Sequence, residues 1–257
     1  AWRWDPSVNP PVTDPNNATD AAILIAWSLL RASRIWAIPE YEAELSTIID
    51  ELRGRMVRST PQGTVLMPGG TGFERDHTIV VNLSYWVYPA LLEFAAQRPQ
   101  DQWQTLVNDG LSLLDRARFG RWELPADWIE VGSGIQIAQG FPPRFSYDAI
   151  RIPLYLYWAR LGSSARWEPY LRFWDYFAQS AFTPAWTNLQ DDSVDSHNAS
   201  PGFYAIISLA RRASERNPYA RDSRNNGSPS SNSYYSDVLH LLANVAEYES
   251  YHAKSER

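Results

Sequence analysis

The sequence predicts an all-α fold in which the helices come in consecutive pairs, as in α/α solenoids and toroids. Three observations support this prediction. Apolar residues recur at helical spacing over most of the 257 residues. Gly- and Pro-rich loops separate the helices, with long irregular insertions at some of the connections. No repeat of fixed period is visible, which argues against tetratricopeptide or ankyrin arrays.

Eight helices are expected, each from an apolar face at helical spacing. The first helix is expected over residues 21–38, and the second begins at residue 39. The other six are expected over residues 84–97, 101–119, 148–161, 167–180, 201–212 and 234–252. Three segments read as irregular: the Gly/Pro-rich stretch 61–81, with room for a short hairpin, the stretch 120–147, and the polar stretch 217–233. The length suits one large core, so we expect a single domain over residues 1–257.

Composition excludes several classes of partner. The net charge is −6 without a Lys/Arg cluster, so nucleic acid is not an expected partner. No apolar run reaches the roughly 18–20 residues that a membrane span requires. The sequence has no cysteine, which excludes thiol catalysis and zinc–thiolate sites, and its four histidines are scattered. No nucleotide-binding motif is present, so we expect neither a metal nor a cofactor.

The aromatic content is unusually high, at 14% with 12 Trp and 14 Tyr. Most of these rings are expected in the core. Trp and Tyr also stack on the apolar faces of sugar rings, because each combines an apolar ring with a polar group. An acidic, Trp-rich chain therefore favours carbohydrate as the ligand.

Two aspartates precede predicted helices: Asp20 in NNATDAAILIAW and Asp148 in FSYDAIRIPLYLYW. The structural interpretation is that each caps its helix or lies in its first turn, where a cap contributes about 0.5–2 kcal/mol. The functional interpretation is that they belong to a catalytic site. Helix N-terminal amides favour an ionised carboxylate, which suits a base better than a general acid that must stay protonated.

Five segments, in this order, resemble glycoside hydrolase family 8: AWRWDP, DPNNATDAAILIAWSLL, VNLSYWVYPAL, LPADWI and FSYDAIRIPLYLYW. The likeness is strongest to bacterial cellulases associated with cellulose synthesis and to rhizobial-type endoglucanases, and it runs from Ala1 to about His240. It implies an (α/α)6 barrel that hydrolyses internal β-1,4-glucosidic bonds with inversion.

The resemblance also implies roles for individual residues. Asp148 matches the general base that activates water, and Asp20 matches the aspartate that orients the sugar at the cleavage site. Tyr147 and Arg151 match neighbours that shape the surroundings of the base. Aromatic residues near the glucan cleft are expected at four positions: Trp2, Trp4 and, as weaker candidates, Tyr85 and Trp86.

Two positions depart from the family's pattern. Ala22 stands where the family usually has a second acidic residue. The family's general acid is a Glu in an SEGQGYGM-like motif upstream of the WRW segment, and this sequence starts at that segment. We therefore expect a barrel that is incomplete at its N-terminus.

Two functions stay open at this point. The first is an endo-β-1,4-glucanase that acts on cellulose, carboxymethylcellulose or mixed-linkage β-glucan. The second is a non-catalytic glucan-binding protein, or an inactive fragment without the general acid. The resemblance further implies a secreted or periplasmic bacterial protein. An incomplete barrel would expose apolar surface, so a homodimer is also expected.

Overall fold

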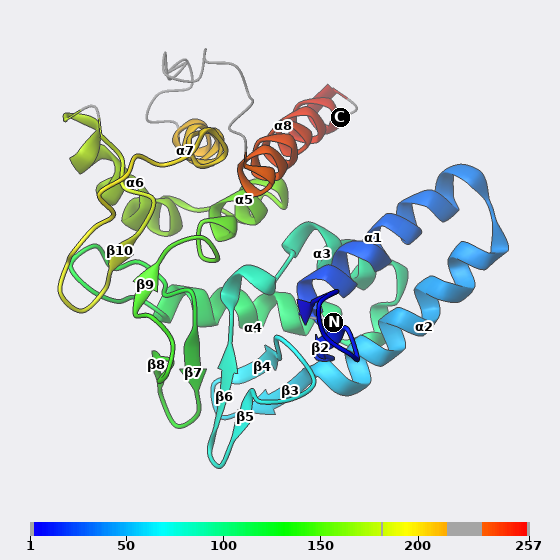
Figure 1. The fold of residues 1–257 in the computed structure, drawn as a ribbon. Coiled ribbons are helices and arrows are strands. Elements are labelled where there is room, and N and C mark those ends of the chain that lie inside the picture. The colour runs from blue at the N-terminus through cyan, green and yellow to red at the C-terminus, as the bar shows by residue number, and fades with distance from the viewer. Residues whose placement is uncertain (1–2, 181, 215–232, 256–257) are drawn as a thin grey trace. The chain divides into compact units, whose positions relative to one another are not determined.

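A computed structural model describes residues 3–180, 182–214 and 233–255 (Figure 1). The chain divides into two compact units, each described by itself below. Unit 1 comprises Ala1–Arg116 with Trp128–Gln139, and unit 2 comprises Ala117–Asp127 with Gly140–Arg257. The expectation of a single domain over residues 1–257 stays a prediction.

Unit 1 contains two helical pairs. The helices are α1 (Thr19–Trp36), α2 (Pro39–Met56), α3 (Tyr88–Gln97) and α4 (Trp103–Arg116), with 3-10 turns at Leu83–Tyr85 and Pro99–Asp101. Helices α1 and α2 run side by side (Figure 1). Helix α1 ends because Ala37 takes a left-handed conformation with φ of 51°, and Pro39 then occupies the first turn of α2.

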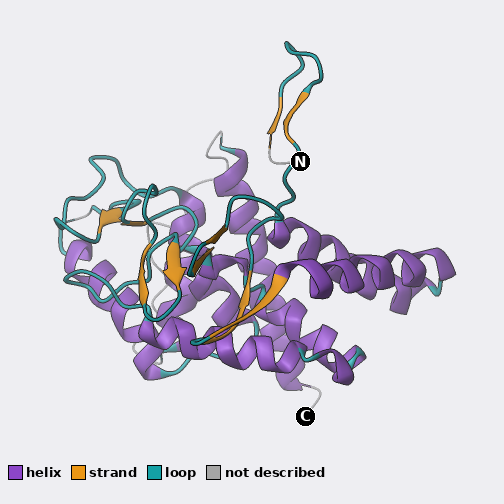
Figure 2. Cartoon of the chain, turned by 90° about the horizontal axis from the view of Figure 1, so that it is seen from below, coloured by secondary structure: helices purple, strands orange, loops and turns teal. Residues whose placement is uncertain are grey.

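Unit 1 also contains three antiparallel sheets made of short strands (Figure 2). Strand β1 (Arg3–Trp4) pairs with β2 (Val12–Asp14), and β3 (Val57–Thr60) pairs with β4 (Gly63–Leu66). The third sheet has the order β5-β6-β7-β8, with bounds Glu74–Arg75, Thr78–Val81, Ile129–Val131 and Ile135–Ile137. Strands β4, β5 and β6 lie in the predicted irregular segment 61–81, and β7 and β8 lie in the segment 120–147. Strands β1, β2 and β3 were not predicted.

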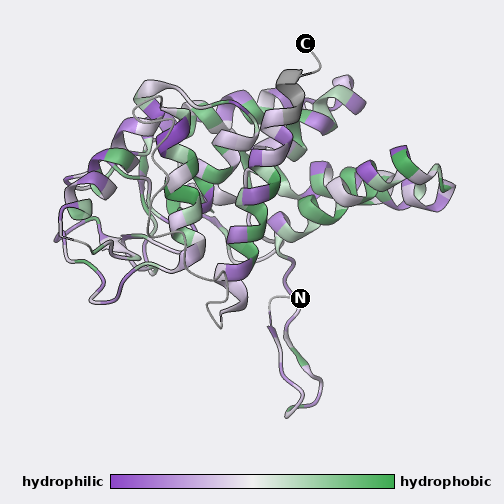
Figure 3. Ribbon diagram, turned by 90° about the horizontal axis from the view of Figure 1, so that it is seen from above, coloured by the Kyte–Doolittle hydropathy of each residue, from purple (hydrophilic) through white to green (hydrophobic). Residues whose placement is uncertain are grey.

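Aromatic rings dominate the core of unit 1. Trp86 and Trp103 are at most 1% exposed, and Phe94 packs edge-to-face on Trp103 with ring centroids 5.6 Å apart. The indole Nε1 of Trp86 donates to the carbonyl of Leu106. Gly110 leaves the room that this indole occupies, since a Cβ there would lie 2.3 Å from it. The helices are accordingly amphipathic, as the hydropathy colouring in Figure 3 shows.

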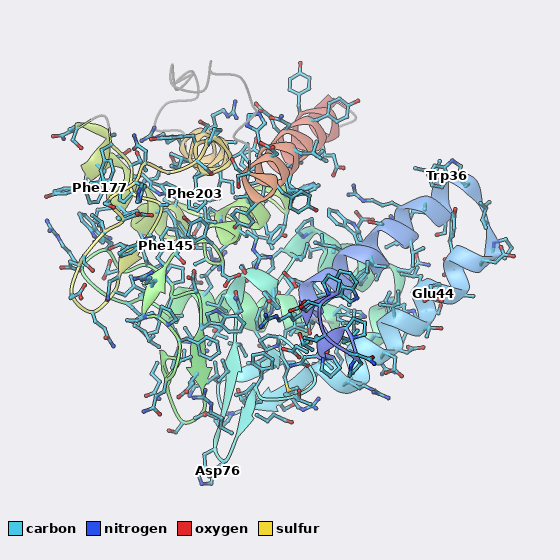
Figure 4. All side chains as sticks on the ribbon, viewed as in Figure 1. Trp36, Glu44, Asp76, Phe145, Phe177 and Phe203 are labelled. Atoms are coloured by element: carbon cyan, nitrogen blue, oxygen red, sulfur yellow. The ribbon has the colours of Figure 1, made fainter. Side chains whose placement is uncertain are left out.

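Unit 2 contains four helices: α5 (Arg151–Trp158), α6 (Ser164–Ala178), α7 (Pro201–Ala213) and α8 (Tyr234–Ser255). Helices α7 and α8 form a pair, α5 packs against both, and α6 packs against α7. Strand β9 (Arg144–Phe145) pairs antiparallel with β10 (Thr187–Asn188). Phe145, labelled in Figure 4, is 1% exposed and packs against Tyr170, Phe173 and Trp174 of α6. This contact anchors the end of β9, from which the chain turns into α5.

Helices α7 and α8 pack closely because one residue at their contact is a glycine. Gly202 is buried, and its amide donates to the hydroxyl of Ser236 at 3.0 Å. A Cβ at Gly202 would lie 2.3 Å from the backbone oxygen of Ser236. Position 202 therefore requires glycine for packing.

The structure confirms all eight predicted helices and corrects their ends. The third helix begins at Tyr88 rather than residue 84, because a 3-10 turn comes first and Pro89 starts the α-helix. The fourth spans Trp103–Arg116, shorter than the predicted 101–119. The fifth begins at Arg151 rather than Asp148, because residues 147–150 form a turn. Of the predicted loop 217–233, residues 217–232 lie outside the described part of the chain.

We predict opposite effects of alanine at two helical glycines. Gly202→Ala should destabilise the protein by about 1–3 kcal/mol, because the backbone of α8 must move away from the new methyl group. Gly54→Ala in α2 is the matched control: nothing lies within 4 Å of its Cβ position, so helix propensity should stabilise it by up to about 1 kcal/mol. Urea or thermal unfolding measures both, and equal effects at the two positions would contradict the packing argument.

Candidate active site

The candidate site in unit 2 is built on the turn between β9 and α5. The amide of Ile150 donates to the carbonyl of Ser146, and the amide of Arg151 donates to the carbonyl of Asp148, both at 3.0 Å. These bonds close the turn that carries Tyr147 and Asp148. Tyr147 is 50% exposed and Asp148 is partly exposed, whereas the flanking Ser146 and Ala149 are buried. The two functional candidates thus project from a turn whose ends are in the core.

Arg151 holds the carboxylate of Asp148. Its Nη2 donates to Oδ1 of Asp148 at 2.8 Å, and the two side chains are 14% and 31% exposed. Among the described residues of unit 2, no hydrogen bond reaches Oδ2 of Asp148. One oxygen of this carboxylate is therefore oriented by the protein, and the side chain as a whole stays partly exposed.

Asp127, and not Asp148, binds the backbone amides of the turn that precedes α5. Its Oδ1 accepts from the amide of Ser146 at 2.9 Å and from the amide of Ala149 at 2.8 Å. Its Oδ2 accepts from the hydroxyl of Ser146. The prediction that Asp148 is a helix cap or lies in the first turn is wrong, because α5 starts three residues later and the turn amides point at Asp127.

Asp127 is 7% exposed, and this burial has an electrostatic consequence. Burial, and then the negative charge of Asp148, raise the pKa of Asp127 to about 6, against three hydrogen bonds that lower it. Desolvation dominates because a buried carboxylate loses its hydration. Asp127 is thus ionised at neutral pH and takes up a proton in mild acid.

Tyr147 lies against two aromatic rings. Its ring centroid is 5.4 Å from that of Phe203 on α7 and 5.9 Å from that of Tyr235 on α8, both edge-on. The hydroxyl of Tyr235 donates to the carbonyl of Tyr147. Burial and the nearby charge of Asp195 raise the pKa of the Tyr147 hydroxyl. The exposed ring is consequently held in one orientation, as a surface that stacks on a sugar requires.

Asp20 lies in unit 1 and is half-buried in the first turn of α1. The residue at the N-cap position is Ala18, which makes no side-chain capping bond, so the cap interpretation of Asp20 is wrong and the first-turn interpretation holds. Its Oδ1 accepts from the amide of Ala21 at 2.9 Å.

Ala22 lines a pocket of about 510 Å³ together with Asn17 and Gly70.

The predicted substrate-binding aromatics of unit 1 differ in exposure. Trp4 is 64% exposed on β1 and is free to stack on a ligand, whereas Trp2 lies outside the described residues. Tyr85 is 7% exposed and packs on Trp128, and Trp86 is fully buried with its indole nitrogen bonded to Leu106. Trp86 belongs to the core of unit 1, where its ring is not exposed to stack on a sugar, and we correct its interpretation accordingly. The assignment of Tyr85 to the glucan cleft stays a prediction.

Among the described residues, no group of three or more His, Cys, Asp or Glu side chains is placed to hold a metal ion. None of the helices in the described part of the chain is long and apolar enough to cross a membrane.

Asp127 is the residue that sequence reasoning missed. It stands in LPADWI, where apolar neighbours surround a single carboxylate. A carboxylate inside an apolar stretch indicates a buried acidic residue, and a buried carboxylate requires hydrogen-bond donors. Those donors lie 19 and 22 residues away in the sequence, so spacing alone does not identify them.

Comparison with known proteins is consistent with this geometry. The sequence profile described as "Glycosyl hydrolases family 8" matches residues 1–249. A protein described as "Probable endoglucanase" from Novacetimonas hansenii is 36% identical over 252 residues, which cover 97% of this chain and 71% of that protein. An "Endoglucanase" from Cellulomonas uda is 35% identical over 212 residues, or 81% of this chain and 58% of that protein.

Among solved structures, the chain is similar to an endo-β-1,4-glucanase of this family from an Achatina fulica gut metagenomic library. The TM-score is 0.85 at 33% identity, and the match covers 96% of this chain and 76% of that one. This likeness confirms the predicted fold class, the (α/α)6 toroid.

We predict a pH-dependent stability difference between the parent and Asp127→Asn. A carboxyl whose pKa is raised by folding contributes stability that is fully present below its unfolded pKa, 3.8, and is lost as the pH rises through about 6. Relative to the Asn variant, the parent's free energy of unfolding should fall by up to about 3 kcal/mol between pH 4 and pH 7. Chemical denaturation at several pH values measures this, and a difference that does not change with pH would contradict the burial argument.

Proposed function

The chain belongs to glycosyl hydrolase family 8, and on that premise we propose that it hydrolyses internal β-1,4-glucosidic bonds with Asp148 as the general base. The observation that carries the proposal is the state of the Asp148 carboxylate. Its Oδ1 is fixed by Arg151, and the side chain is 31% exposed. A base that activates water needs an oriented and solvent-accessible carboxylate, and Asp148 meets both conditions.

The proposed reaction inverts the anomeric centre. Asp148 takes a proton from a water molecule, whose oxygen attacks the anomeric carbon while the glycosidic C–O bond breaks on the opposite face. The leaving oxygen takes a proton from a general acid. Inversion needs about 6.5–9.5 Å between the two carboxyl groups, so that the water fits beside the base. The guanidinium of Arg151 supports the role of Asp148 because its hydrogen bond to Oδ1 holds the carboxylate in one orientation.

We also propose contacts with the glucan for the other residues that match the family. Asp20 is proposed to orient the sugar at the cleavage site, supported by its partly exposed position at the start of α1. Tyr147 and Trp4 are proposed to stack on glucose rings, supported by exposures of 50% and 64%. Stacking of this kind favours a chain of flat, equatorially linked sugars such as a β-1,4-glucan.

The substrates proposed are cellulose in soluble forms, such as carboxymethylcellulose, and mixed-linkage β-glucan. Because such polymers lie outside the cytoplasm, a secreted or periplasmic location in bacteria accords with the proposal. A homodimer is proposed as the state in solution, supported by exposed apolar residues on the α1–α2 hairpin, among them Ile35 and Trp36 (Figure 4).

We predict that Asp148→Asn reduces hydrolysis at least about 10²-fold while oligosaccharide binding is retained. Asparagine keeps the shape and still accepts from Arg151, but it cannot accept a proton from water. Reducing-end release from carboxymethylcellulose or barley β-glucan measures activity, and calorimetry with cello-oligosaccharides measures binding. Proton NMR of the first products should show the α-anomer, as inversion requires.

The matched control is Asp192→Asn. Asp192 is exposed in unit 2 and has a positive φ of 61°, a conformation that asparagine tolerates equally well. It should hydrolyse glucan as the parent does. Full activity of Asp148→Asn would contradict the assignment of the base. Binding without any hydrolysis by the parent would instead favour the alternative function, a glucan-binding protein.

A further inference from the structure

We propose that Asp127 is a positioning residue that holds the general base by binding the backbone amides on both sides of the Tyr147–Asp148 pair. The proposal rests on the function proposed above and adds to it a residue that does not touch the substrate. Asp127 acts through the backbone of the turn, and its side chain is 7% exposed.

The hydrogen bonds of Asp127 involve residues on both sides of Asp148 in the sequence. The amide of Ser146 lies two residues before Asp148 and the amide of Ala149 lies one residue after it, and both donate to the same oxygen, Oδ1. The hydroxyl of Ser146 donates to Oδ2, so the carboxylate is bound at both of its oxygens. Two amides on one acceptor fix the peptide planes between them, and with these planes the direction in which Tyr147 and Asp148 project.

The carboxylate is itself anchored. The amide of Asp127 donates to the carbonyl of Arg144 at 2.7 Å, and Arg144 belongs to β9, directly before the turn. Asp127 therefore ties the turn to its own segment, about 20 residues earlier in the chain. That segment is in turn bonded to β9, whose Phe145 is packed in the core. A side chain held in this way cannot follow local movements of the turn.

Asp127 is not a cap of α5. Capping side chains bind amides in the first turn of a helix, whereas Ser146 and Ala149 precede the start of α5 at Arg151. What Asp127 fixes is the segment that carries the base. The helix has its own bonds, since the amide of Arg151 donates to the carbonyl of Asp148.

The charge of Asp127 supports the same conclusion. A buried carboxylate close to Asp148 opposes folding, through desolvation and like-charge repulsion. An ionised carboxylate is, however, the acceptor that binds three donors at once, because it has no proton of its own to place. The charged groups next to Asp127 are Asp148 and Arg151, whereas burial raises the pKa of Tyr235 and keeps its hydroxyl neutral. Protonation of Asp127 would remove part of its accepting capacity.

Three variants separate positioning from simple stabilisation. Asp127→Asn keeps an oxygen for the two amides and offers its NH2 group to the Ser146 hydroxyl, which can accept. Asp127→Leu has a similar shape and removes every acceptor. Ser146→Ala removes only the bond to Oδ2. Asp192→Asn, on the exposed surface of unit 2, again serves as the control.

The kinetic readout is the division between kcat and KM on carboxymethylcellulose or a cello-oligosaccharide. Asp127→Leu should lower kcat about 10²-fold with KM little changed, because a misplaced base affects the chemical step and leaves sugar contacts in place. Asp127→Asn should lose less than about tenfold, since it keeps the two amide bonds. The parent's kcat should also show an acid-side inflection near pH 6 that the Asn variant lacks.

The structural readout does not depend on activity. Hydrogen exchange of the Ser146 and Ala149 amides should be faster in Asp127→Leu and preserved in Asp127→Asn, at a temperature where thermal unfolding shows both variants to be folded. Unchanged exchange in the Leu variant, or an unchanged kcat in a parent that hydrolyses glucan, would overturn the inference. A parent that releases no reducing ends while its turn amides respond as described would overturn the proposed function instead.

Discussion

The hydrogen bonds of the buried Asp127 carboxylate determine how the candidate site is arranged. Three donors from Ser146 and Ala149 converge on it, and they are the groups that would otherwise stay unpaired where β9 ends and α5 has not begun. Because Asp127 binds these amides, the carboxylate of Asp148 is left to pair with Arg151 and to face solvent. A carboxylate placed to cap the turn itself would be unavailable to a water molecule.

The helices of unit 2 hold the same turn from the other side. Tyr147 meets Phe203 of α7 and Tyr235 of α8, and the hydroxyl of Tyr235 binds the carbonyl of Tyr147. These two helices stay close because Gly202 admits the backbone of Ser236. Packing within the helical pair thus determines the orientation of an aromatic ring next to the base, which links the core of unit 2 to its chemistry.

Much of the fold could be predicted from the sequence, because helical spacing of apolar residues is a local signal. The apolar stripe of the second helix, formed by Leu45, Ile48, Ile49 and Leu52, is one example: all of it is buried except Ile48, which is half-buried. The short strands were not predictable in the same way. Strand β7 at Ile129–Val131 pairs with β6 at Thr78–Val81, and so distant a pairing leaves no pattern within either segment.

The candidate site could be predicted only in part, for a similar physical reason. The order of short segments identified Asp148, Tyr147 and Arg151, which the structure brings together on one turn. Asp127 was missed because its partners are backbone amides of a distant segment, and amides carry no sequence signature. Trp86 was misassigned because exposure depends on tertiary packing, here on the space left by Gly110.

A crystal structure of the chain with a bound cello-oligosaccharide would show whether Asp148 activates the attacking water. We expect a water molecule within about 2.6–3.2 Å of Oδ2 of Asp148, on the face of an anomeric carbon opposite the leaving oxygen. Arg151 should stay bonded to Oδ1, and both turn amides should stay bonded to Asp127. An oligosaccharide whose cleavable bond lies away from Asp148, or an Oδ2 that a protein donor occupies, would contradict the account.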